Sequence, residues 1–205
     1  MDIKITSPSV EILTPIEEIK SFEKRIERIG RVCYKSENKT TEISSKTFIK
    51  NIIKNGHESV LEHCSISFLL CVSRTCSHQL VRHRIASYSQ ESQRYVNYKK
   101  KNEIKIILPD NLRDSLQDNI VLDAINTSIQ SYEILVAGGI KPEDARYLLP
   151  NCVATNLVCT FNLRELRHVI KIRTDNSAQH EIRKVFKEIL ELMKVNIPIF
   201  FEDIF

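Results

Sequence analysis

Residues 65–95 read SISFLLCVSRTCSHQLVRHRIASYSQESQRY, and three patterns follow one another in this stretch. In residues 65–73 apolar side chains alternate with others, a period of two that predicts a β-strand with one buried face. The next part carries Cys76, Leu80 and Val81 at helical spacing, which predicts a helix. Beyond Arg84, serine and glutamine side chains predominate. Such side chains compete for helical hydrogen bonds, so we expect an irregular loop there.

The segments before this stretch predict two strands and two helices. Residues 3–13 read as a strand pair or extended segment that Pro8 breaks. Residues 16–29 have helical apolar spacing, and Gly30 is expected to end that helix. A second helix, built on Phe48, Ile52 and Ile53, is expected to end near Gly56.

The segments after this stretch are mainly helical. Their expected elements are a short strand at 104–108, a long amphipathic helix or helix pair at 111–136 that ends at Gly138-Gly139, a short helix at 143–149 with Pro142 in its first turn, a strand at 152–161 and a last helix at 178–195. A further helix begins at Asn162. Glu165 follows three residues later and completes a pattern that resembles a capping box.

Helices and strands are therefore mixed without regular βαβ alternation. This favours an α+β fold, with a mainly antiparallel sheet flanked by helices. No segment reads as a linker, so residues 1–205 are expected to form a single domain. The chain has only four glycines, which disfavours the glycine-rich phosphate loops of nucleotide folds.

Composition places the protein among soluble globular chains. Hydrophobic residues make up 42% and charged residues 27%, and the formal net charge is +4, which suits an enzyme for small anions without requiring nucleic acid. Residues 1–10 lack the apolar core of a signal peptide, and the apolar runs at 68–72 and 197–201 are far shorter than the roughly 20 residues that cross a bilayer. We therefore expect a cytoplasmic protein that does not associate with membranes.

The six cysteines are interpreted as reduced thiols, because a chain of this length without a secretion signal belongs in a reducing compartment. No Cys-x-x-Cys pair occurs. Most of the cysteines lie in or beside apolar stretches, where cysteine is usually a small core residue: Cys64, Cys71, Cys152 and Cys159. None of the six is expected to be catalytic.

Residues 79–95 contain the strongest candidate for an anion site. If the helix continues, Gln79, Arg82 and His83 share one face, since they occur at i, i+3 and i+4. The loop beyond can direct backbone N–H groups, Ser92 and Arg94 at one phosphate. The basic groups of 82–84 point in different directions, so one segment can address two neighbouring anionic ligands.

Three other interpretations are open. The basic segment 82–94 could be a solvated face or a nucleic-acid-binding module, although few aromatic residues are interleaved with it. Ser92 could be a nucleophile, although no base is paired with it in sequence. A metal hydrolase is disfavoured, because His57 and His63 are six residues apart, whereas HExxH places its histidines four apart. We therefore predict no metal site.

Four blocks together resemble the flavin-dependent thymidylate synthases. The first is Arg-His-Arg at 82–84, then seven residues, then Ser92, with the likeness extending from Gln79 to Tyr95. The others are GHESVLEH at 56–63, Ala145-Arg146 followed by LLP, and NLRELRHVIKIRTDNSAQHEI at 162–182. The blocks occur in the family's order and cover nearly the whole chain.

This resemblance implies a reductive methylation of dUMP to dTMP. In such enzymes FAD is reduced by NADPH, 5,10-methylenetetrahydrofolate donates the carbon, and the flavin supplies the hydride. The resemblance also implies a homotetramer whose active sites form where subunits meet. No nucleic-acid partner is implied.

The resemblance assigns residues to each ligand. For dUMP they are Gln79, Leu80, Val81, Arg82, Gln90, Glu91, Ser92, Gln93, Arg94, Arg146 and Arg173. For FAD they are His57, Ser59, Arg82, His83, Arg84, Gln90, Asn162, Leu163, Arg164 and His168. Arg173 is the expected catalytic residue. A guanidinium against the ring nitrogen and carbonyl favours the ionised uracil, which then needs no thiol nucleophile.

Four positions depart from the family's pattern. Ser89 and Gln90 stand where Asn and Glu are common, and His168 and Ser177 stand where other members carry Asn and His. We therefore expect no carboxylate at position 90. The FAD contacts of His168 and Ser177 are not fixed by the resemblance.

Overall fold

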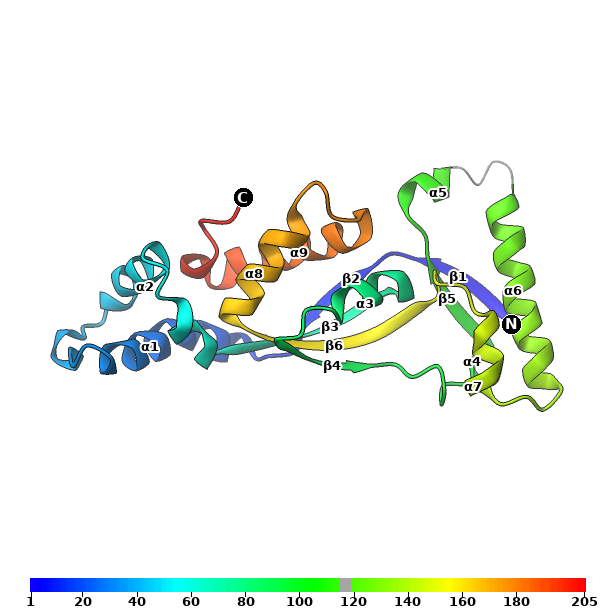
Figure 1. Ribbon diagram of the computed structural model, residues 1–205, viewed down its shortest axis with the longest axis horizontal. Coiled ribbons are helices and arrows are strands. Elements are labelled where there is room, and N and C mark those ends of the chain that lie inside the picture. Colours follow the sequence, from blue (N-terminus) through cyan, green and yellow to red (C-terminus); the bar gives the residue numbers. More distant parts are fainter. Residues whose placement is uncertain (115–118) are drawn as a thin grey trace. The chain divides into compact units, whose positions relative to one another are not determined.

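The computed structural model of the protein describes residues 1–114 and 119–205 (Figure 1). The chain divides into two compact units that are each assembled from distant segments. Unit 1 comprises Met1–Ser9, Leu70–Arg82 and Ser89–Leu157, and unit 2 comprises Val10–Leu69, His83–Tyr88 and Val158–Phe205.

One sheet has four strands in the order β2-β3-β6-β4. The strands are β2 (Ser9–Ile12), β3 (Ser65–Ser73), β6 (Ala154–Asn162) and β4 (Ala86–Gln90). The sheet is antiparallel, and with the surrounding helices it confirms the α+β class. β3 has the bounds that the alternating pattern predicted, and its residues 66, 68, 70 and 72 are fully buried.

The second sheet pairs β1 (Asp2–Thr6) with β5 (Glu103–Ile107) in parallel, from Asp2 opposite Glu103 to Thr6 opposite Ile107. Pro8 separates β1 from β2, as predicted, but the two strands enter different sheets. The expectation of a mainly antiparallel sheet therefore holds for four strands, and this pair is the exception.

Unit 2 is mainly helical. Its helices are α1 (Ile16–Val32), η1 (Glu37–Lys39), α2 (Ser44–Lys54), η2 (Glu58–His63), α8 (Leu163–Thr174), α9 (His180–Asn196) and η5 (Pro198–Phe200). α8 packs on α9 and η2, while α1 packs on α2. The α-helices of this unit each bury apolar side chains on one face, such as Ile19, Phe22 and Ile26 of α1, and this burial is the main favourable term for folding.

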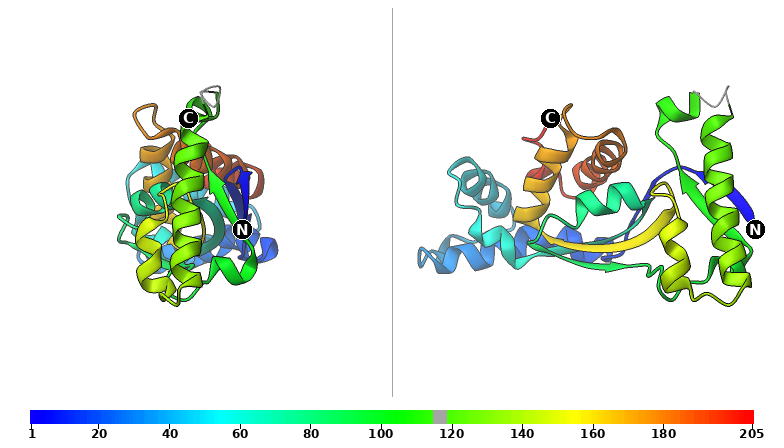
Figure 2. Two further views of the ribbon diagram at one scale, coloured as in Figure 1. Left: turned by 90° about the vertical axis from the view of Figure 1, so that its right-hand side faces the viewer. Right: turned by 45° about the vertical axis from the view of Figure 1, so that its right-hand side comes forward.

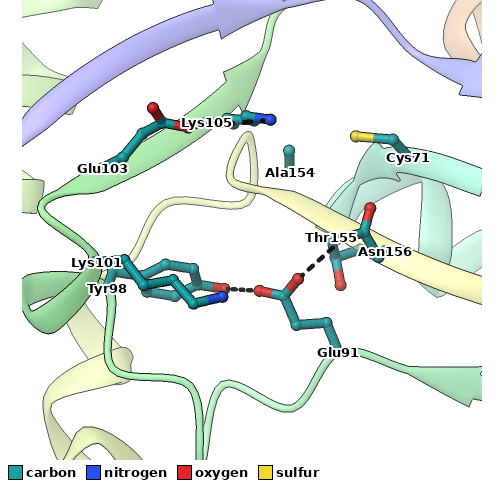
Figure 3. Close-up of a pocket in the computed structure, with 9 residues that line it drawn as sticks. All are labelled: Cys71, Glu91, Tyr98, Lys101, Glu103, Lys105, Ala154, Thr155 and Asn156. Atoms are coloured by element: carbon teal, nitrogen blue, oxygen red, sulfur yellow. Dashed lines mark hydrogen bonds and ion pairs between the residues drawn. The ribbon is translucent and has the colours of Figure 1, made fainter.

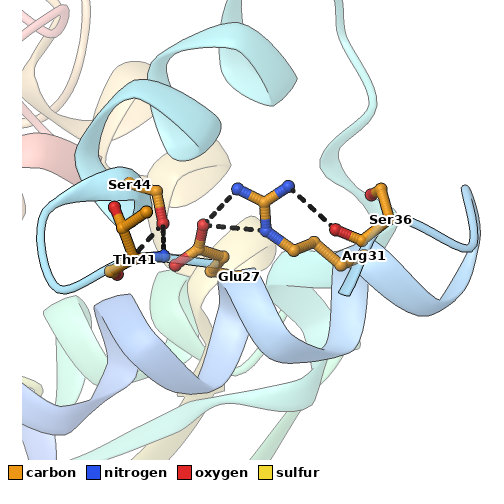
Figure 4. A network of polar contacts seen from close by, with 5 residues as sticks. All are labelled: Glu27, Arg31, Ser36, Thr41 and Ser44. Carbon is orange, nitrogen blue, oxygen red and sulfur yellow. Dashed lines mark hydrogen bonds and ion pairs between the residues drawn. The ribbon is translucent and has the colours of Figure 1, made fainter. Parts of the chain in front are cut away.

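Gly30 does not end α1, contrary to the prediction, because the helix continues to Val32. A Cβ on Gly30 would lie 2.5 Å from the Phe48 ring, so this glycine permits close packing of α1 against α2. The neighbouring Arg31 is buried and donates to Glu27 at 2.6 and 2.9 Å. Figure 4 shows these bonds between Arg31 and Glu27. The Arg31 guanidinium also lies 5.2 Å from the Phe48 ring centroid. A tertiary contact has here overridden the usual helix-stop preference of glycine.

Unit 1 contains a second core between helices and the two-stranded sheet. Its helices are α3 (Arg74–Leu80), α4 (Tyr98–Lys101), α5 (Asp110–Asp114), α6 (Ile120–Ala137), α7 (Pro142–Ala145) and η4 (Arg146–Leu148). α6 lies beside α7 and η4 (Figure 2). The core joins residues of α4, β5, α6 and α7 with Leu108 and Val153 of the connecting segments. Its members are Tyr98, Ile104, Ile106, Leu108, Ile125, Ile129, Tyr132, Ala145 and Val153.

The predicted helix or helix pair at 111–136 corresponds to α5 and α6, and residues 115–118 lie outside the described part. The expected helix at 143–149 divides into α7 and η4, with Pro142 in the first turn as predicted. In the two described ranges, no helix has both the length and the apolar character needed to cross a bilayer.

The predicted loop beyond Arg84 is wrong for residues 86–90. The segment beyond Arg84 was expected to be a loop, yet it forms β4, in which Ser87 and Ser89 are exposed and the alternate residues are half-buried. Pairing within a sheet has overridden the preference of serine for turns. The lysines at 99–101 belong to α4, which is capped by Asn97 through a 3.1 Å hydrogen bond from the Lys100 N–H.

Candidate functional site

An open pocket of about 220 Å³ in unit 1 gathers basic side chains from α3, η4 and the loop after β4. We call it the arginine pocket. It is lined by Arg74, His78, Gln93, Arg146, Tyr147, Leu149, Pro150 and Asn151. None of these described lining residues is acidic, so the pocket has an excess of positive charge.

Backbone hydrogen bonds fix the position of Arg74 in this pocket. The N–H of Arg74 donates to the Val153 carbonyl at 3.0 Å, and the N–H of Thr75 donates to the Asn151 carbonyl at 3.1 Å. The Ser73 hydroxyl caps α3 by accepting from the Cys76 N–H at 3.0 Å. The first turn of α3 is therefore tied to the segment that forms the opposite wall.

The charges of the arginine pocket favour an anionic ligand. Burial lowers the pKa of Arg74, Arg146 lowers it further, and Tyr98 and Glu91 oppose these effects. A guanidinium stays protonated even so, because its ordinary pKa is above about 12. The Arg146 Nε donates to the Glu143 carbonyl at 3.1 Å, which orients its guanidinium plane. Two oriented, partly desolvated guanidinium groups suit a phosphate.

Of the residues assigned to dUMP, Gln93 and Arg146 line the arginine pocket together. The Leu80 side chain is fully buried in the core and is not part of the lining of this pocket. The Gln90 amide donates to the Ser77 hydroxyl at 2.8 Å and to the Thr155 hydroxyl at 3.3 Å, so it faces other side chains of unit 1. Its assignments to dUMP and FAD therefore require these bonds to break.

The other members of this group lie at or near the surface. Gln79 and Val81 are half-buried and Arg82 is exposed. The predicted shared face of Gln79, Arg82 and His83 is wrong, because α3 ends at Leu80. Ser92 is half-buried, and its hydroxyl accepts from the Arg94 N–H at 3.3 Å. The exposed Arg94 guanidinium lies 3.8 Å from the Glu143 carboxylate.

Glu91 points away from the arginine pocket and into a separate cavity of about 180 Å³. Its carboxylate accepts from the Tyr98 hydroxyl at 2.9 Å and from the Asn156 amide at 3.4 Å (Figure 3). The Glu91 N–H also donates to the Asn156 carbonyl at 2.8 Å. These bonds anchor the start of the loop that carries Ser92 and Gln93. The Glu91 carboxylate is therefore engaged with the protein rather than directed at the assigned dUMP site.

A second open pocket, of about 470 Å³, lies in unit 2 along α8, and we call it the α8 pocket. It is lined by Glu58, Glu62, Ile85, Asn162, Arg164, Glu165, Arg167, His168 and Lys171. The structure thus brings together Asn162, Arg164 and His168, three of the residues assigned to FAD. Its lining contains both acidic and basic side chains.

The start of α8 has the predicted cap. The Asn162 side-chain oxygen accepts from the Glu165 N–H at 2.8 Å, which leaves the amide N–H₂ as the group that can reach a ligand. Leu163 is fully buried, and its N–H donates to the Cys64 carbonyl at 2.9 Å. Neither the side chain nor the N–H of Leu163 is therefore placed to contact FAD as the resemblance implies.

The arginines of the α8 pocket are already paired. Arg164 donates to Glu62 at 2.6 Å, and this hydrogen bond raises the pKa of Arg164. Arg167 is buried, lies 3.4 Å from Glu58 and makes two 2.7 Å bonds to Asp203. Arg167 therefore joins α8 to the C-terminal segment. Arg164, half exposed, can exchange its carboxylate for another anion.

The remaining residues assigned to FAD lie outside the lining of both pockets. His57 is exposed, and its Nδ1 lies 3.1 Å from the Tyr34 hydroxyl. Ser59 is exposed in η2, and Arg84 is exposed before β4. His83 is nearly buried, and its Nε2 accepts from the Arg173 Nε at 2.9 Å.

A family model described as "Thymidylate synthase complementing protein" matches residues 16–199. A protein of Geobacter sulfurreducens is 38% identical over 85% of this chain and 78% of its own length, and one of Pyrococcus abyssi is 41% identical over 75% of this chain. Both are named flavin-dependent thymidylate synthase. The chain belongs to this family.

The match spans 64% of the Pyrococcus abyssi family member's own length. Solved structures agree on the fold. A UMP/dUMP methylase, PolB from Streptomyces cacaoi bound with 5-Br dUMP, superposes with a TM-score of 0.80 at 22% identity, over 97% of this chain and 95% of the other. The family's relatives are enzymes by name, so the nucleic-acid-binding alternative is not supported.

The protonated state of the buried cysteines agrees with a family whose chemistry is expected to need no thiol nucleophile. Burial raises the pKa of Cys64 and Cys152 to about 11 and that of Cys159 to about 12. These thiols are protonated at neutral pH and are therefore poor nucleophiles.

Two residues of the arginine pocket, Arg74 and His78, were not among the site residues predicted from the sequence. They occur at i and i+4 in the segment that precedes the Arg-His-Arg motif. That spacing on a predicted helix was a usable signal, since such residues share a face. The pairing of Arg164 with Glu62 was also missed, and its partners are far apart in sequence.

Proposed function

We propose that this chain converts dUMP to dTMP, using FAD as the hydride carrier and NADPH and 5,10-methylenetetrahydrofolate as co-substrates. The observation that carries the proposal is membership of the flavin-dependent thymidylate synthase family over residues 16–199. The two pockets add chemistry that suits it, since one concentrates cations and the other gathers hydrogen-bond donors along a helix.

The phosphate of dUMP binds in the arginine pocket under this proposal. Arg74 and Arg146 supply charge-assisted donors, and the buried Gln93 supplies an amide. Ser92, whose hydroxyl begins a turn in the same loop, contributes as a phosphate ligand and not as a nucleophile. Ser92→Ala should therefore weaken dUMP binding while saturating dUMP restores turnover. A variant that is inactive at saturating dUMP would instead support the nucleophile interpretation.

The α8 pocket fits FAD by the chemistry of its donors. The Asn162 amide, the Arg164 guanidinium and His168 face one open pocket, and a pyrophosphate accepts hydrogen bonds from such groups. Arg164 must exchange Glu62 for the pyrophosphate, which is feasible because both side chains are about half exposed, at 51% and 46%. FAD, when bound, supplies the hydride that completes the methyl group.

Arg173 activates the uracil ring. The carbon that attacks the one-carbon unit must become electron-rich, and a guanidinium beside the ring nitrogen and carbonyl stabilises the negative charge that develops there. Arg173 lies in the last turns of α8, near its end at Thr174, so its long side chain extends from a rigid element. Arg173→Ala should lower turnover about a hundredfold or more and leave FAD bound.

The active unit is a homotetramer with shared sites, its subunits are single domains, and it works in the cytoplasm. Large apolar side chains on the surface of α6 support association, since Ile120 is 71% and Ile134 is 70% exposed. Tyr147, on the wall of the arginine pocket, is 84% exposed. Sedimentation analysis should give a tetramer, and a fully active monomer would refute this part of the proposal.

The test of the proposed function uses the purified full chain. FAD should bind with its visible absorbance, and NADPH oxidation should be faster with dUMP than without it. A chain that cannot be loaded with FAD under any condition would overturn the proposal. The Arg173→Ala variant serves as a control that binds FAD but forms dTMP about a hundredfold or more slowly.

A further inference from the structure

His83 and Arg173 form a direct side-chain contact within unit 2. The Nε–H of Arg173 donates to the Nε2 of His83 at 2.9 Å. Arg173 belongs to α8 and His83 to the short segment before β4, so the two residues come from different parts of the chain. The Tyr88 hydroxyl donates to the His83 carbonyl at 2.9 Å, which fixes the backbone from which the imidazole extends.

The contact defines the protonation state of the imidazole. An arginine has only donors, so the Nε2 of His83 must present a lone pair and the single ring proton must lie on Nδ1. The Nδ1 of His83 faces Glu165, whose Oε1 is 3.9 Å away. Both side chains are about nine-tenths buried.

The surrounding charges keep the imidazole neutral. Burial is the main cause that lowers the pKa of His83 to about 4, and the neighbouring Arg173 and His168 contribute to the same shift. Glu165, the acidic group that faces the ring, has a pKa raised by its own burial. His83 is therefore an acceptor for Arg173 throughout the neutral range.

We propose that His83 is a positioning residue for Arg173, in addition to any contact that it makes with FAD. The proposal rests on the proposed function, in which Arg173 acts on the uracil ring. A hydrogen bond at Nε restricts rotation of the Arg173 guanidinium group at the end of its aliphatic side chain. The planar fork is then presented in one orientation, and a fixed donor pair is worth far more to a developing charge than a mobile one.

A double-mutant cycle tests this coupling in the full chain. His83→Leu removes the acceptor, and His83→Gln keeps an oxygen that can accept from Arg173. Turnover should fall about tenfold or more in His83→Leu, recover partly in His83→Gln, and be no lower in the double variant His83→Leu/Arg173→Ala than in Arg173→Ala alone. Losses that multiply in the double variant would overturn the proposal.

Flavin loading separates positioning from cofactor binding. The absorbance of bound FAD in His83→Leu should stay near that of the parent, and the matched control His63→Gln, an exposed residue of η2, should leave both loading and turnover unchanged. Loss of FAD in His83→Leu with normal turnover after reloading would assign His83 to the cofactor alone. If the parent chain forms no dTMP, the proposed function is refuted. The hydrogen bond between His83 and Arg173 can still be tested by NMR measurement of the His83 tautomer.

The pH dependence and the tautomer give readouts that do not need activity. Nitrogen NMR of labelled histidine should find His83 with its proton on Nδ1, and Arg173→Ala should perturb that signal. Between pH 6.5 and about 4 the unfolded chain binds a proton that the folded chain refuses, so the parent should lose stability relative to His83→Gln as the pH falls through this window. A doubly protonated ring at pH 7, or identical stability profiles, would contradict the proposed contact.

Discussion

The arginine pocket and the α8 pocket differ in how their cations are balanced. In the arginine pocket Arg74 and Arg146 face a wall with no acidic residue among its described lining. In the α8 pocket Arg164 is bonded to Glu62, and Arg167 is bonded to Asp203 and lies close to Glu58. An anion entering the first pocket meets no carboxylate among the described lining residues. An anion entering the second must replace a carboxylate.

This difference suggests which ligand each pocket favours. A phosphomonoester is a compact dianion, and its binding gains most where unbalanced guanidinium groups are already partly desolvated. A large cofactor such as FAD spreads its contacts over rings, ribose and pyrophosphate, so it depends less on any one ion pair. The arginine pocket should therefore be far more sensitive than the α8 pocket to loss of one charge.

Among substitutions in the two pockets, the largest effect on ligand binding is expected from Arg146→Ala. Loss of a charge-assisted donor typically costs about 1.5–3 kcal/mol, so dUMP should bind roughly ten- to a hundredfold more weakly, while FAD loading is unchanged. Calorimetric titration of dUMP measures the change. Lys141→Ala is the control. It removes an exposed cation at the start of α7, just before Arg146, and should change dUMP affinity little. Equal losses in both variants would show that only long-range charge matters.

A smaller effect is expected at the start of α8. Asn162→Ala removes the cap on the Glu165 N–H and should lower the free energy of unfolding by about 1 kcal/mol, measured by urea denaturation. Asn162→Ser keeps a capping oxygen but lacks the amide, so it should restore stability without restoring full FAD affinity. If Ser and Ala variants bind FAD as tightly as the parent, Asn162 is a cap and nothing more.

Glu91→Gln tests the anchor of the loop that carries Ser92 and Gln93. The Tyr98 hydroxyl keeps an acceptor in this variant, but the charged character of the bond is lost, which should cost about 0.5–1 kcal/mol of stability. Affinity for dUMP should fall only about two- to threefold, because the effect is indirect. A loss as large as that of Arg146→Ala would mean that the Glu91 carboxylate contacts dUMP directly.

The smallest effect is expected from Glu62→Gln. An exposed ion pair contributes up to about 1 kcal/mol, so the change in stability should stay below that. FAD should bind about two- to fivefold more tightly at low salt, because Arg164 no longer has to leave a carboxylate. The gain should shrink as salt is added. Weaker FAD binding would indicate that Glu62 itself contacts the cofactor.

The start of α8 was predictable from sequence because its determinants are local. Asn162 and Glu165 are three residues apart, and the cap forms between them as the pattern indicates. The same holds for β3, whose alternation is complete within nine residues. Local chemistry is therefore sufficient where the partners are neighbours along the chain.

Other features depend on partners that are distant in sequence. Gly30 has the pattern of a helix end, but the Phe48 ring against it explains why a glycine occurs inside α1. The direction of Glu91 is decided by Tyr98 and by Asn156, which is 65 residues away. The family resemblance points to whole segments, and it does not show which side chains of a segment line a pocket and which bond to other side chains of the protein.

The central claim is that this family member makes dTMP with a flavin. Its most direct measurement is the formation of dTMP by the purified chain from dUMP, 5,10-methylenetetrahydrofolate and NADPH, with and without added FAD. We expect dTMP only when FAD is present, and about a hundredfold less or none from Arg173→Ala. Formation of dTMP at full rate by FAD-free protein, or none by fully FAD-loaded protein, would contradict the account.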